Sequence, residues 1–213
     1  MKIASVHYTD KYFEHNVRNA KNVHISSDQH LSKIADCDFM VLWGGSDISP
    51  SLYNQRKVHS GFIDEFRDNL EVKAFEYAVA HDIPILGICR GAQLVCALTG
   101  GSLWQHVNNH AGRNHSVTMK DGSQLRVNSL HHQMMRLPED AELLGWSSHN
   151  LSDFRFDEEI IPHFVDAPEP EFVYFPKAKC IGVQAHPEYS DWYSELTQKT
   201  VELMDKYLGV NLE

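Results

Sequence analysis

The chain has few cysteines and no long run of apolar or basic residues. Its four cysteines, Cys37, Cys89, Cys96 and Cys180, form neither a C-x-x-C pair nor a dense disulfide pattern, which favours a reducing cytoplasm. No stretch approaches the roughly 18–20 apolar residues that a membrane-spanning helix needs. The apolar start of the chain is too short for a signal peptide. These absences predict a cytoplasmic protein without a membrane segment.

Net charge and histidine spacing argue against two further classes of protein, nucleic-acid-binding proteins and metal enzymes. The formal net charge is −10, and a protein that binds the phosphate backbone needs a basic face, so no nucleic-acid partner is expected. The fourteen histidines raise the question of a metal. However, neither the pair His106 and His110 nor the adjacent His131 and His132 has H-E-x-x-H or Cys/His zinc spacing. We therefore predict no metal at the site and no cofactor.

Apolar runs and helical periodicity alternate along the first hundred residues. Strands are predicted at 2–7, 22–26, 38–43 and 83–88, with a long helix at 64–82. The predicted apolar stripe of that helix consists of Phe66, Leu70, Ala74, Phe75, Ala78 and Val79. This alternation predicts an α/β fold with a mostly parallel central sheet and helices on both faces. The length suits one core, so a single domain spanning 1–213 is expected.

The second half of the chain is more irregular and richer in strands. A strand is predicted at 125–130, a hairpin at 172–175 with 180–184, and a last helix at about 190–208. The segment 150–172 is acidic and contains three prolines, which is typical of a long surface loop.

The sequence Gly87-x-Cys89-x-Gly91 lies where the fourth predicted strand meets the next helix. A nucleophile elbow is such a turn, with small residues two positions either side of an exposed, strained nucleophile. The start of a helix favours the thiolate form of Cys89, which is the reactive one. A buried structural cysteine is the alternative interpretation.

Two other stretches complement this cysteine. His186-Pro-Glu188 offers a base for a thiol nucleophile and a carboxylate to orient that base. Gly44-Gly45 follows another predicted strand and allows close approach of the backbone to a ligand. In parallel sheets, ligands bind at the carboxyl ends of the strands, where both Gly44-Gly45 and Cys89 are expected.

Taken together, these motifs resemble a known family. Gly87-Ile-Cys89-Arg-Gly91-Ala-Gln93 and Gly182-Val-Gln-Ala-His186-Pro-Glu188 resemble the class I glutamine amidotransferase superfamily. Further stretches narrow the resemblance to the gamma-glutamyl hydrolase branch, peptidase family C26. These stretches are 44–53, Arg67-Asp68 with Glu71, 100–105 and 127–133. This branch includes the gamma-glutamyl-gamma-aminobutyrate hydrolases. The resemblance implies a flavodoxin-like class I amidotransferase fold with a small β-rich excursion.

The resemblance also implies a chemistry. Cys89 would attack the gamma-carbonyl of a small gamma-glutamyl compound and form a glutamyl thioester, while His186 shuttles the proton and Glu188 orients His186. The residues that would supply backbone N–H groups to the oxyanion hole are Gly44, Gly45 and Arg90. The residues that would lie at the substrate are Gln93, His131, His132 and Gln133; a structural pair is the alternative interpretation of His131 and His132. Arg67 and Glu71, four residues apart on a helix, are expected to form a surface or helix-anchoring ion pair.

Some features leave the substrate and the partners open. The family's tryptophan before His-Pro-Glu is Ala185 here, which reshapes the pocket wall and leaves the leaving amine undetermined. If the acidic segment 150–172 lines the mouth of the site, it would favour a cationic amine. One alternative function is a glutaminase subunit that supplies ammonia to a separate synthetase; another is a non-catalytic binding protein. The sequence is compatible with a homo-oligomer.

Overall fold

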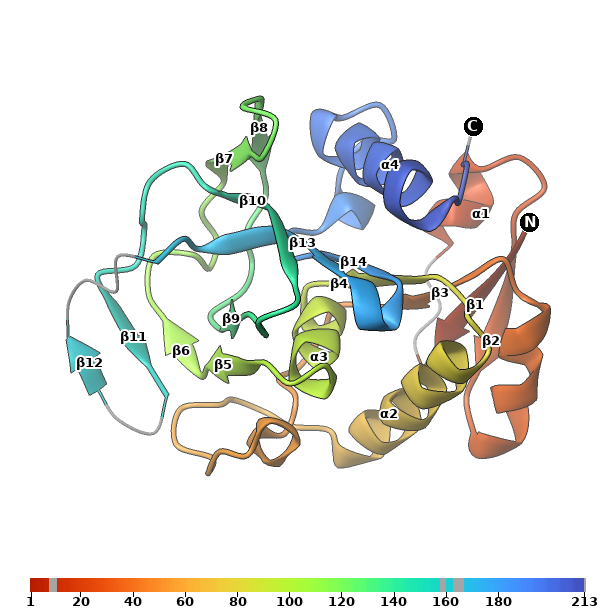
Figure 1. The fold of residues 1–213 in the computed structure, drawn as a ribbon, viewed down its shortest axis with the longest axis horizontal. Helices are drawn as coiled ribbons and strands as arrows, with labels where there is room; N and C mark the ends of the chain where they lie inside the picture. Colours follow the sequence, from red (N-terminus) through yellow and green to blue (C-terminus); the bar gives the residue numbers. More distant parts are fainter. Residues whose placement is uncertain (8–10, 158–159, 163–166, 213) are drawn as a thin grey trace.

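The computed structural model describes residues 1–7, 11–157, 160–162 and 167–212. Its centre is a nine-stranded sheet in the order β2-β1-β3-β4-β14-β13-β10-β7-β8 (Figure 1). These strands are β1 (Lys2–Val6), β2 (Lys21–Ile25), β3 (Phe39–Leu42), β4 (Ile85–Ile88), β7 (His115–Met119), β8 (Gln124–Val127), β10 (Glu142–Ser147), β13 (Pro170–Phe175) and β14 (Cys180–Val183). The strands from β2 to β14 pair in parallel, and those from β14 to β8 pair antiparallel. The predicted parallel sheet and hairpin are therefore confirmed.

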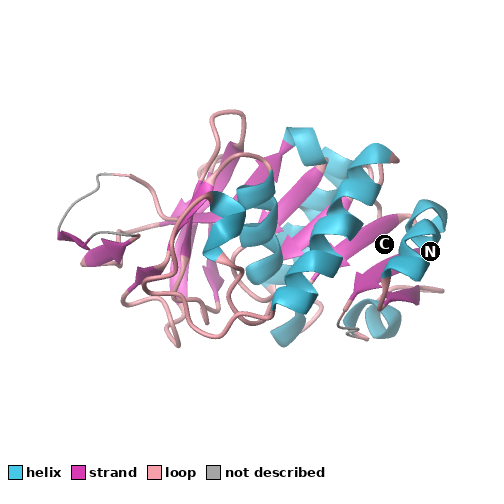
Figure 2. Cartoon of the chain, turned by 90° about the horizontal axis from the view of Figure 1, so that it is seen from below, coloured by secondary structure: helices cyan, strands magenta, loops and turns pink. Residues whose placement is uncertain are grey.

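Helices cover both faces of this sheet, as predicted. The helices are α1 (Tyr12–Asn16), α2 (Glu65–Ala80), α3 (Arg90–Leu98) and α4 (Glu195–Leu208). Short 3₁₀ segments are η1 (Asp28–Asp36), η2 (Pro50–Tyr53), η3 (Pro176–Ala178) and η4 (Pro187–Tyr189). Figure 1 shows α2 and α3 on one side of the sheet and α1 and α4 on the other, and Figure 2 shows the helical layer in front of the strands. Within the described residues, no helix has the length and apolarity to cross a membrane.

Two smaller sheets extend the antiparallel end of the central one. The first pairs β5 (Ser102–Trp104) with β9 (Met134–Arg136). The second consists of β6 (His106–Val107), β11 (Phe154–Phe156) and β12 (Ile160–Pro162). They form the β-rich excursion that the sequence predicts.

The core consists of two apolar layers separated by the sheet. Alternate residues of a strand point to opposite faces, so Phe39 and Val41 of β3 join the layer under α1 and α4, while Met40 and Leu42 join the layer under α2 and α3. All four residues are buried, which explains why β3 is a continuous apolar run.

The predicted apolar stripe of α2 is only partly correct. Leu70, Ala74, Phe75 and Ala78 are buried. In contrast, Phe66 is 67% exposed and Val79 is 39% exposed. The buried residues near the start of α2 are instead Arg67, Asp68 and Glu71. Hydrophobic periodicity misses them because charged side chains can be buried when ionic partners on other elements neutralise them.

The prediction of a surface loop at 150–172 is wrong for much of that segment. The segment contains β11, β12 and the start of β13. Glu169 and Glu171 are completely buried, because histidine side chains from other segments and Arg155 of β11 surround them. The predicted acidic residues Glu158, Glu159 and Asp166 lie outside the described residues. Two of the charges that would have favoured a cationic amine therefore do not face solvent.

Candidate active site

Cys89 stands between β4 and α3 in a conformation that side chains rarely adopt. Its backbone has φ +49° and ψ −104°, a strained geometry that costs on the order of 1–3 kcal/mol. Both flanking glycines are needed. An added Cβ at Gly91 would lie 2.0 Å from the carbonyl oxygen of Leu42, and one at Gly87 would lie 2.9 Å from the amide nitrogen of Ala92. The turn therefore has the shape of a nucleophile elbow.

His186 and Glu188 follow β14, the strand that pairs with β4. The backbone N–H of Cys89 donates to the carbonyl oxygen of Val183, 2.7 Å away, so the two strand ends are held side by side. Nδ1 of His186 lies 2.7 Å from Oε1 of Glu188. Burial lowers the pKa of His186, but hydrogen bonds with Cys89 and Glu188 outweigh it and raise this pKa to about 10. The three side chains form one hydrogen-bonded chain.

Gly44 lies against the side chains of His186 and Cys89. An added Cβ there would lie 2.6 Å from Cε1 of His186 and 3.6 Å from Cβ of Cys89. Any side chain at Gly44 would therefore displace the imidazole. Glycine at this position leaves the backbone in direct contact with the site.

Arg67 orients the loop that contains Gly44 and Gly45. Its Nη2 donates to the carbonyl oxygens of Trp43 (2.9 Å) and Gly44 (3.1 Å). Among the described residues no peptide bond is cis, so the N–H groups of Gly44 and Gly45 point away from Arg67. Gly45 has φ +151°, and an added Cβ there would lie 2.2 Å from Nη1 of Arg67. The guanidinium thus fixes the direction of both N–H groups.

A buried ion network lies behind the elbow. The side chain of Arg90 forms ion pairs with Asp68 and Glu71, and Glu71 also accepts a hydrogen bond from Nε of Arg67 at 2.8 Å. Burial raises the pKa of Asp68, although Arg90 opposes this rise. The sequence predicts the Arg67–Glu71 pair correctly as a helix anchor but not its burial. The network joins α2, α3 and the glycine loop.

Asn128 is a residue at the site to which the sequence assigned no role. Its Oδ1 accepts a hydrogen bond from the backbone N–H of His186 at 2.8 Å, and its Nδ2 donates to the carbonyl oxygen of His186 at 2.7 Å. Both bonds hold the backbone that carries the imidazole. Asn128 is part of the 127–133 motif, but it is 58 residues from His186, and no local pattern reveals this contact.

Gln93 and Gln133 form a buried amide chain beside the elbow helix. Nε2 of Gln93 donates to the carbonyl oxygen of Gln133 (3.3 Å) and to Oε1 of Gln184 (3.2 Å). Nε2 of Gln133 in turn donates to Ser60 (3.2 Å) and to the carbonyl oxygen of Gln105 (3.3 Å). The structure therefore brings these two predicted site residues together.

The adjacent histidines His131 and His132 have different surroundings. His131 is buried, and its Nδ1 lies 2.8 Å from the carbonyl oxygen of Gln133. His132 is half-buried, with Nε2 3.1 Å from Oδ1 of Asp47 and Nδ1 3.2 Å from Nδ1 of His106. The hydrogen bond with Asp47 raises the pKa of His132 in spite of its burial. Only His132 is open to solvent.

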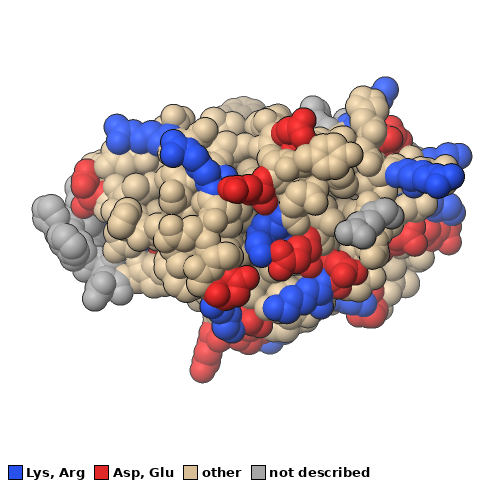
Figure 3. All heavy atoms as spheres, turned by 90° about the horizontal axis from the view of Figure 1, so that it is seen from above, with Lys and Arg blue, Asp and Glu red and all other residues tan. Residues whose placement is uncertain are grey.

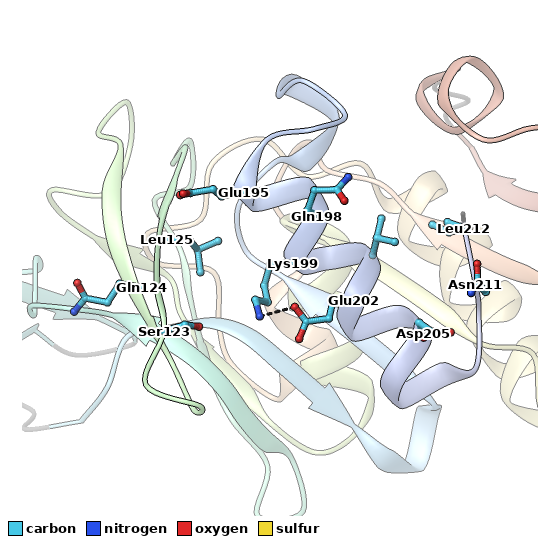
Figure 4. A pocket seen from close by; sticks show the side chains of 11 residues that line it. Ser123, Gln124, Leu125, Glu195, Gln198, Lys199, Glu202, Asp205, Asn211 and Leu212 are labelled. Carbon is cyan, nitrogen blue, oxygen red and sulfur yellow. Dashed lines mark hydrogen bonds and ion pairs between the residues drawn. The ribbon is translucent and has the colours of Figure 1, made fainter.

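Surface features elsewhere are separate from this site. A pocket of about 540 Å³ lies between α4 and the β7–β8 hairpin, where Lys199 pairs with Glu202 at 2.6 Å (Figure 4). Among the residues that the structure describes, those that line this pocket include none of the candidate active-site residues. Figure 3 shows basic and acidic side chains interspersed on one face of the molecule rather than separated by sign.

Cys89 is expected to be the only cysteine that iodoacetamide labels rapidly. Burial raises the pKa of Cys37 to about 11 and that of Cys96 to about 12, and it also raises that of Cys180. These three thiols stay protonated at neutral pH, whereas Cys89 lies beside His186 at the start of α3, the kind of setting in which reactive cysteines are found. Mass spectrometry after brief treatment should find one labelled peptide, and equal labelling of Cys37 or Cys180 would contradict the expectation.

Comparison with known proteins connects the chain to a family. The sequence model of the Peptidase C26 family matches residues 2–154. The glutamine amidotransferase-like protein YvdE of Lactococcus lactis is 32% identical over 120 residues, which cover 46% of this chain and 51% of that protein. The carbamoyl phosphate synthase small chain of Helicobacter acinonychis is 26% identical over 164 residues, covering 73% of this chain and 39% of that protein. The matches thus span about half the length of such curated relatives, or less.

A solved structure supports the same fold. The glutamine amidotransferase from Thermotoga maritima aligns with 98% of this chain and 84% of its own, with a TM-score of 0.62 at 18% identity. At this identity the likeness concerns the fold, which is the class I amidotransferase fold that the sequence predicts.

Proposed function

Because the chain belongs to the Peptidase C26 family and is a hydrolase or amidotransferase of the glutamine amidotransferase type, we propose that it cleaves the gamma-glutamyl amide bond of a small compound. The observation that supports this most directly is the strained Cys89 in hydrogen-bond contact with His186, which is itself paired with Glu188. A nucleophile, a base and an orienting carboxylate are the groups that acyl transfer through a thiol needs.

In the first half of the proposed reaction, the Cys89 thiolate attacks the gamma-carbonyl carbon. Negative charge develops on the carbonyl oxygen, and the N–H groups of Gly44, Gly45 and Arg90 would stabilise it. The His186 imidazolium then donates its proton to the leaving nitrogen, the C–N bond breaks, and a glutamyl thioester remains on Cys89. Glu188 holds the imidazole in the orientation that this proton transfer requires.

In the second half, water attacks the thioester carbonyl while neutral His186 accepts a proton from that water. The C–S bond breaks, glutamate leaves, and Cys89 returns as the thiolate next to the His186 imidazolium. The same oxyanion hole serves both halves, because the charge develops on the same oxygen each time.

Residues around the elbow would contact the glutamyl part. We place the half-exposed His132 nearest to the substrate, together with Gln93, which is buried but lies one turn into α3 from Cys89. His131 and Gln133 are buried and bonded inside the protein, so they would support this wall of the site from behind. The amine side of the substrate would face the loops around the strand ends, where selectivity usually resides.

The test uses the purified protein alone. Glutamine and gamma-glutamyl amides of neutral, cationic and anionic amines are supplied separately, and released glutamate is measured for each. Rapid turnover of one of the gamma-glutamyl amides without any partner supports the proposal. Absence of turnover for the whole panel would contradict it, provided that Cys89 remains alkylatable.

A second candidate function is a glutaminase subunit that supplies ammonia to a separate synthetase. The match to the small chain of a carbamoyl phosphate synthase supports this second candidate. In that case the purified chain would hydrolyse glutamine slowly, and addition of a synthetase would accelerate it. The two candidates therefore differ in substrate and in dependence on a partner.

Arg67→Lys is expected to lower kcat by about 10–100-fold with little change in KM. Lysine keeps the charge but cannot hold two carbonyl groups and Glu71 at once, so the N–H groups of Gly44 and Gly45 lose their fixed direction. Loss of a whole oxyanion donor costs about 100–1,000-fold, and a loosened donor costs less. Arg126→Lys, on the exposed side of β8, is the matched control and should behave like the wild type. An unchanged kcat in Arg67→Lys would contradict this role.

A further inference from the structure

A second group of polar side chains is buried at the antiparallel end of the sheet, apart from Cys89. His110 lies in the loop after β6, His115 at the start of β7, His131 in the loop after β8, and Glu171 on β13 (Figure 1). All four side chains are more than nine-tenths buried. We call these four residues the His/Glu cluster.

The ligand atoms of the His/Glu cluster converge on the carboxylate of Glu171. From its Oε1, Nε2 of His115 is 2.9 Å away, Nε2 of His131 is 3.6 Å away and Nδ1 of His110 is 3.9 Å away. Zinc bonds of about 2.0–2.1 Å in a tetrahedron separate the ligand atoms by about 3.4 Å, so these distances bracket the spacing of a metal site. Ligand atoms of His110, His115 and Glu171 all lie within 4.8 Å of one another, a group that does not include His131, which joins the cluster through Glu171.

The second nitrogen of each ring faces an acceptor outside the cluster. Nδ1 of His131 lies 2.8 Å from the carbonyl oxygen of Gln133, and Nδ1 of His115 lies 3.3 Å from that of Arg113. Nε2 of His110 lies 3.1 Å from Oε2 of Glu169. Because the carbonyl oxygens of Gln133 and Arg113 only accept, Nδ1 of His131 and Nδ1 of His115 carry protons, and the Nε2 atoms of both rings face Glu171. Nε2 of His115 is within hydrogen-bond distance of Oε1 of Glu171, at 2.9 Å. Histidines that bind metals are commonly oriented in this way.

The charge of Glu171 requires a cation close by. No lysine or arginine pairs with it among the residues that the structure describes, whereas Arg155 pairs with the neighbouring Glu169 at 3.3 Å. Oε2 of Glu171, both ring nitrogens of His110 and Nε2 of His131 are buried without a hydrogen-bond partner within the described part of the chain. Nε2 of His115 hydrogen-bonds to Oε1 of Glu171, but the unpartnered nitrogens of His110 and His131 and Oε2 of Glu171 need a further positive charge or proton between them.

We propose that the His/Glu cluster binds one divalent transition-metal ion, with Zn²⁺ the ion that best suits three imidazoles and a carboxylate. Hard cations such as Mg²⁺ prefer oxygen ligands and would bind weakly here. The prediction of no metal rested on histidine pairs that are close in sequence. The cluster instead combines ligands from four separate segments.

The site is structural rather than hydrolytic, and it supports the candidate active site. The ion ties His131 to the sheet, and the same 127–133 segment carries Asn128, which holds the backbone of His186. Glu171 is also linked to the catalytic side, because its carbonyl oxygen accepts a hydrogen bond from the N–H of Gln184 at 2.8 Å. Removal of the ion should therefore loosen residues 127–133 first.

The first test uses the untagged wild-type protein, so that no variant has to fold. Zinc content is measured by mass spectrometry, the metal is removed with a chelator, and Zn²⁺, Co²⁺ or Mg²⁺ is added back. We expect one equivalent of Zn²⁺, a rise in Tm with Zn²⁺ but not with Mg²⁺, and the visible absorption of tetrahedral Co²⁺. Hydrogen exchange of 127–133 should slow when Zn²⁺ returns. Absence of tight Zn²⁺ binding by the metal-free protein would overturn the proposal and leave a cluster neutralised by protons.

Variants then assign the ligands. His110→Gln and Glu171→Gln should each weaken Zn²⁺ affinity by at least about 100-fold, and Glu169→Gln by about 10–100-fold through its contact with His110. His149→Gln, an exposed histidine, is the matched control and should bind Zn²⁺ like the wild type. Cys89→Ala should also bind Zn²⁺ normally, which separates this proposal from the proposed hydrolysis. Equal affinity in His110→Gln, Glu171→Gln and the control would exclude the cluster as the binding site.

Discussion

Replacing Cys89 by alanine is expected to abolish hydrolysis of gamma-glutamyl amides, with kcat at least about 10⁶-fold lower. The thiolate is the only proposed nucleophile, and without it no thioester forms. His186→Ala should be almost as inactive, because a nucleophile and its base act as a unit. Released glutamate, measured at high enzyme concentration over hours, is the readout. Circular dichroism should show that both variants keep the fold.

Glu188→Gln serves as the graded member of this series. An orienting group affects the tautomer and position of the imidazole, so its loss should leave roughly 100-fold more activity than the loss of Cys89. The 2.7 Å contact between Glu188 and Nδ1 of His186 is the bond that this change weakens. If Glu188→Gln is as inactive as Cys89→Ala, Glu188 does more than orient. Normal turnover by Cys89→Ala would refute the proposed mechanism.

Glu71→Gln is expected to lower the free energy of unfolding by about 3–5 kcal/mol. Glu71 is completely buried between the guanidinium groups of Arg67 and Arg90. When Glu71 loses its charge, Asp68 is left as the one carboxylate of this network to neutralise Arg67 and Arg90. A buried charge without full compensation is costly. Urea denaturation measures the change as a lower midpoint at an unchanged slope.

Glu76→Gln on the exposed face of the same helix is the control for this change. It removes the same charge where water solvates it, so its effect should stay within about 0.5 kcal/mol. Equal stability of the two variants would mean that the network is not needed for folding. Activity of Glu71→Gln should fall as well, because Arg67 also orients the Gly44–Gly45 loop.

The elbow could be predicted from the sequence because its signals are local. Gly87, Cys89 and Gly91 lie within five residues, and steric contacts of the backbone in that turn decide which residues fit. His186 and Glu188 are likewise close in sequence, and their 2.7 Å contact needs only one loop. That these two motifs meet was implied by the family resemblance, and the parallel pairing of β4 with β14 brings the two strand ends side by side.

Asn128, Arg67 and the buried carboxylates show why the other parts of the candidate site could not be predicted from the sequence. Each is polar, and on composition alone each belongs at the surface. Their positions depend on partners far away in the chain, such as His186 for Asn128 and three histidines for Glu171. Periodicity describes which face of an element is apolar, but it contains no information on which distant charge will neutralise a polar one.

By itself, the sequence determined the alternation of strands and helices, the strained turn at Cys89 and the His186–Glu188 pair, because short-range sterics and hydrophobic period act within a few residues. Only the tertiary structure decided which charges are buried, how Arg67 directs the Gly44 and Gly45 N–H groups, and that three histidines from separate segments face Glu171. A buried charge is tolerated only beside its counter-charge, and the distance between the two is set by how the whole sheet packs.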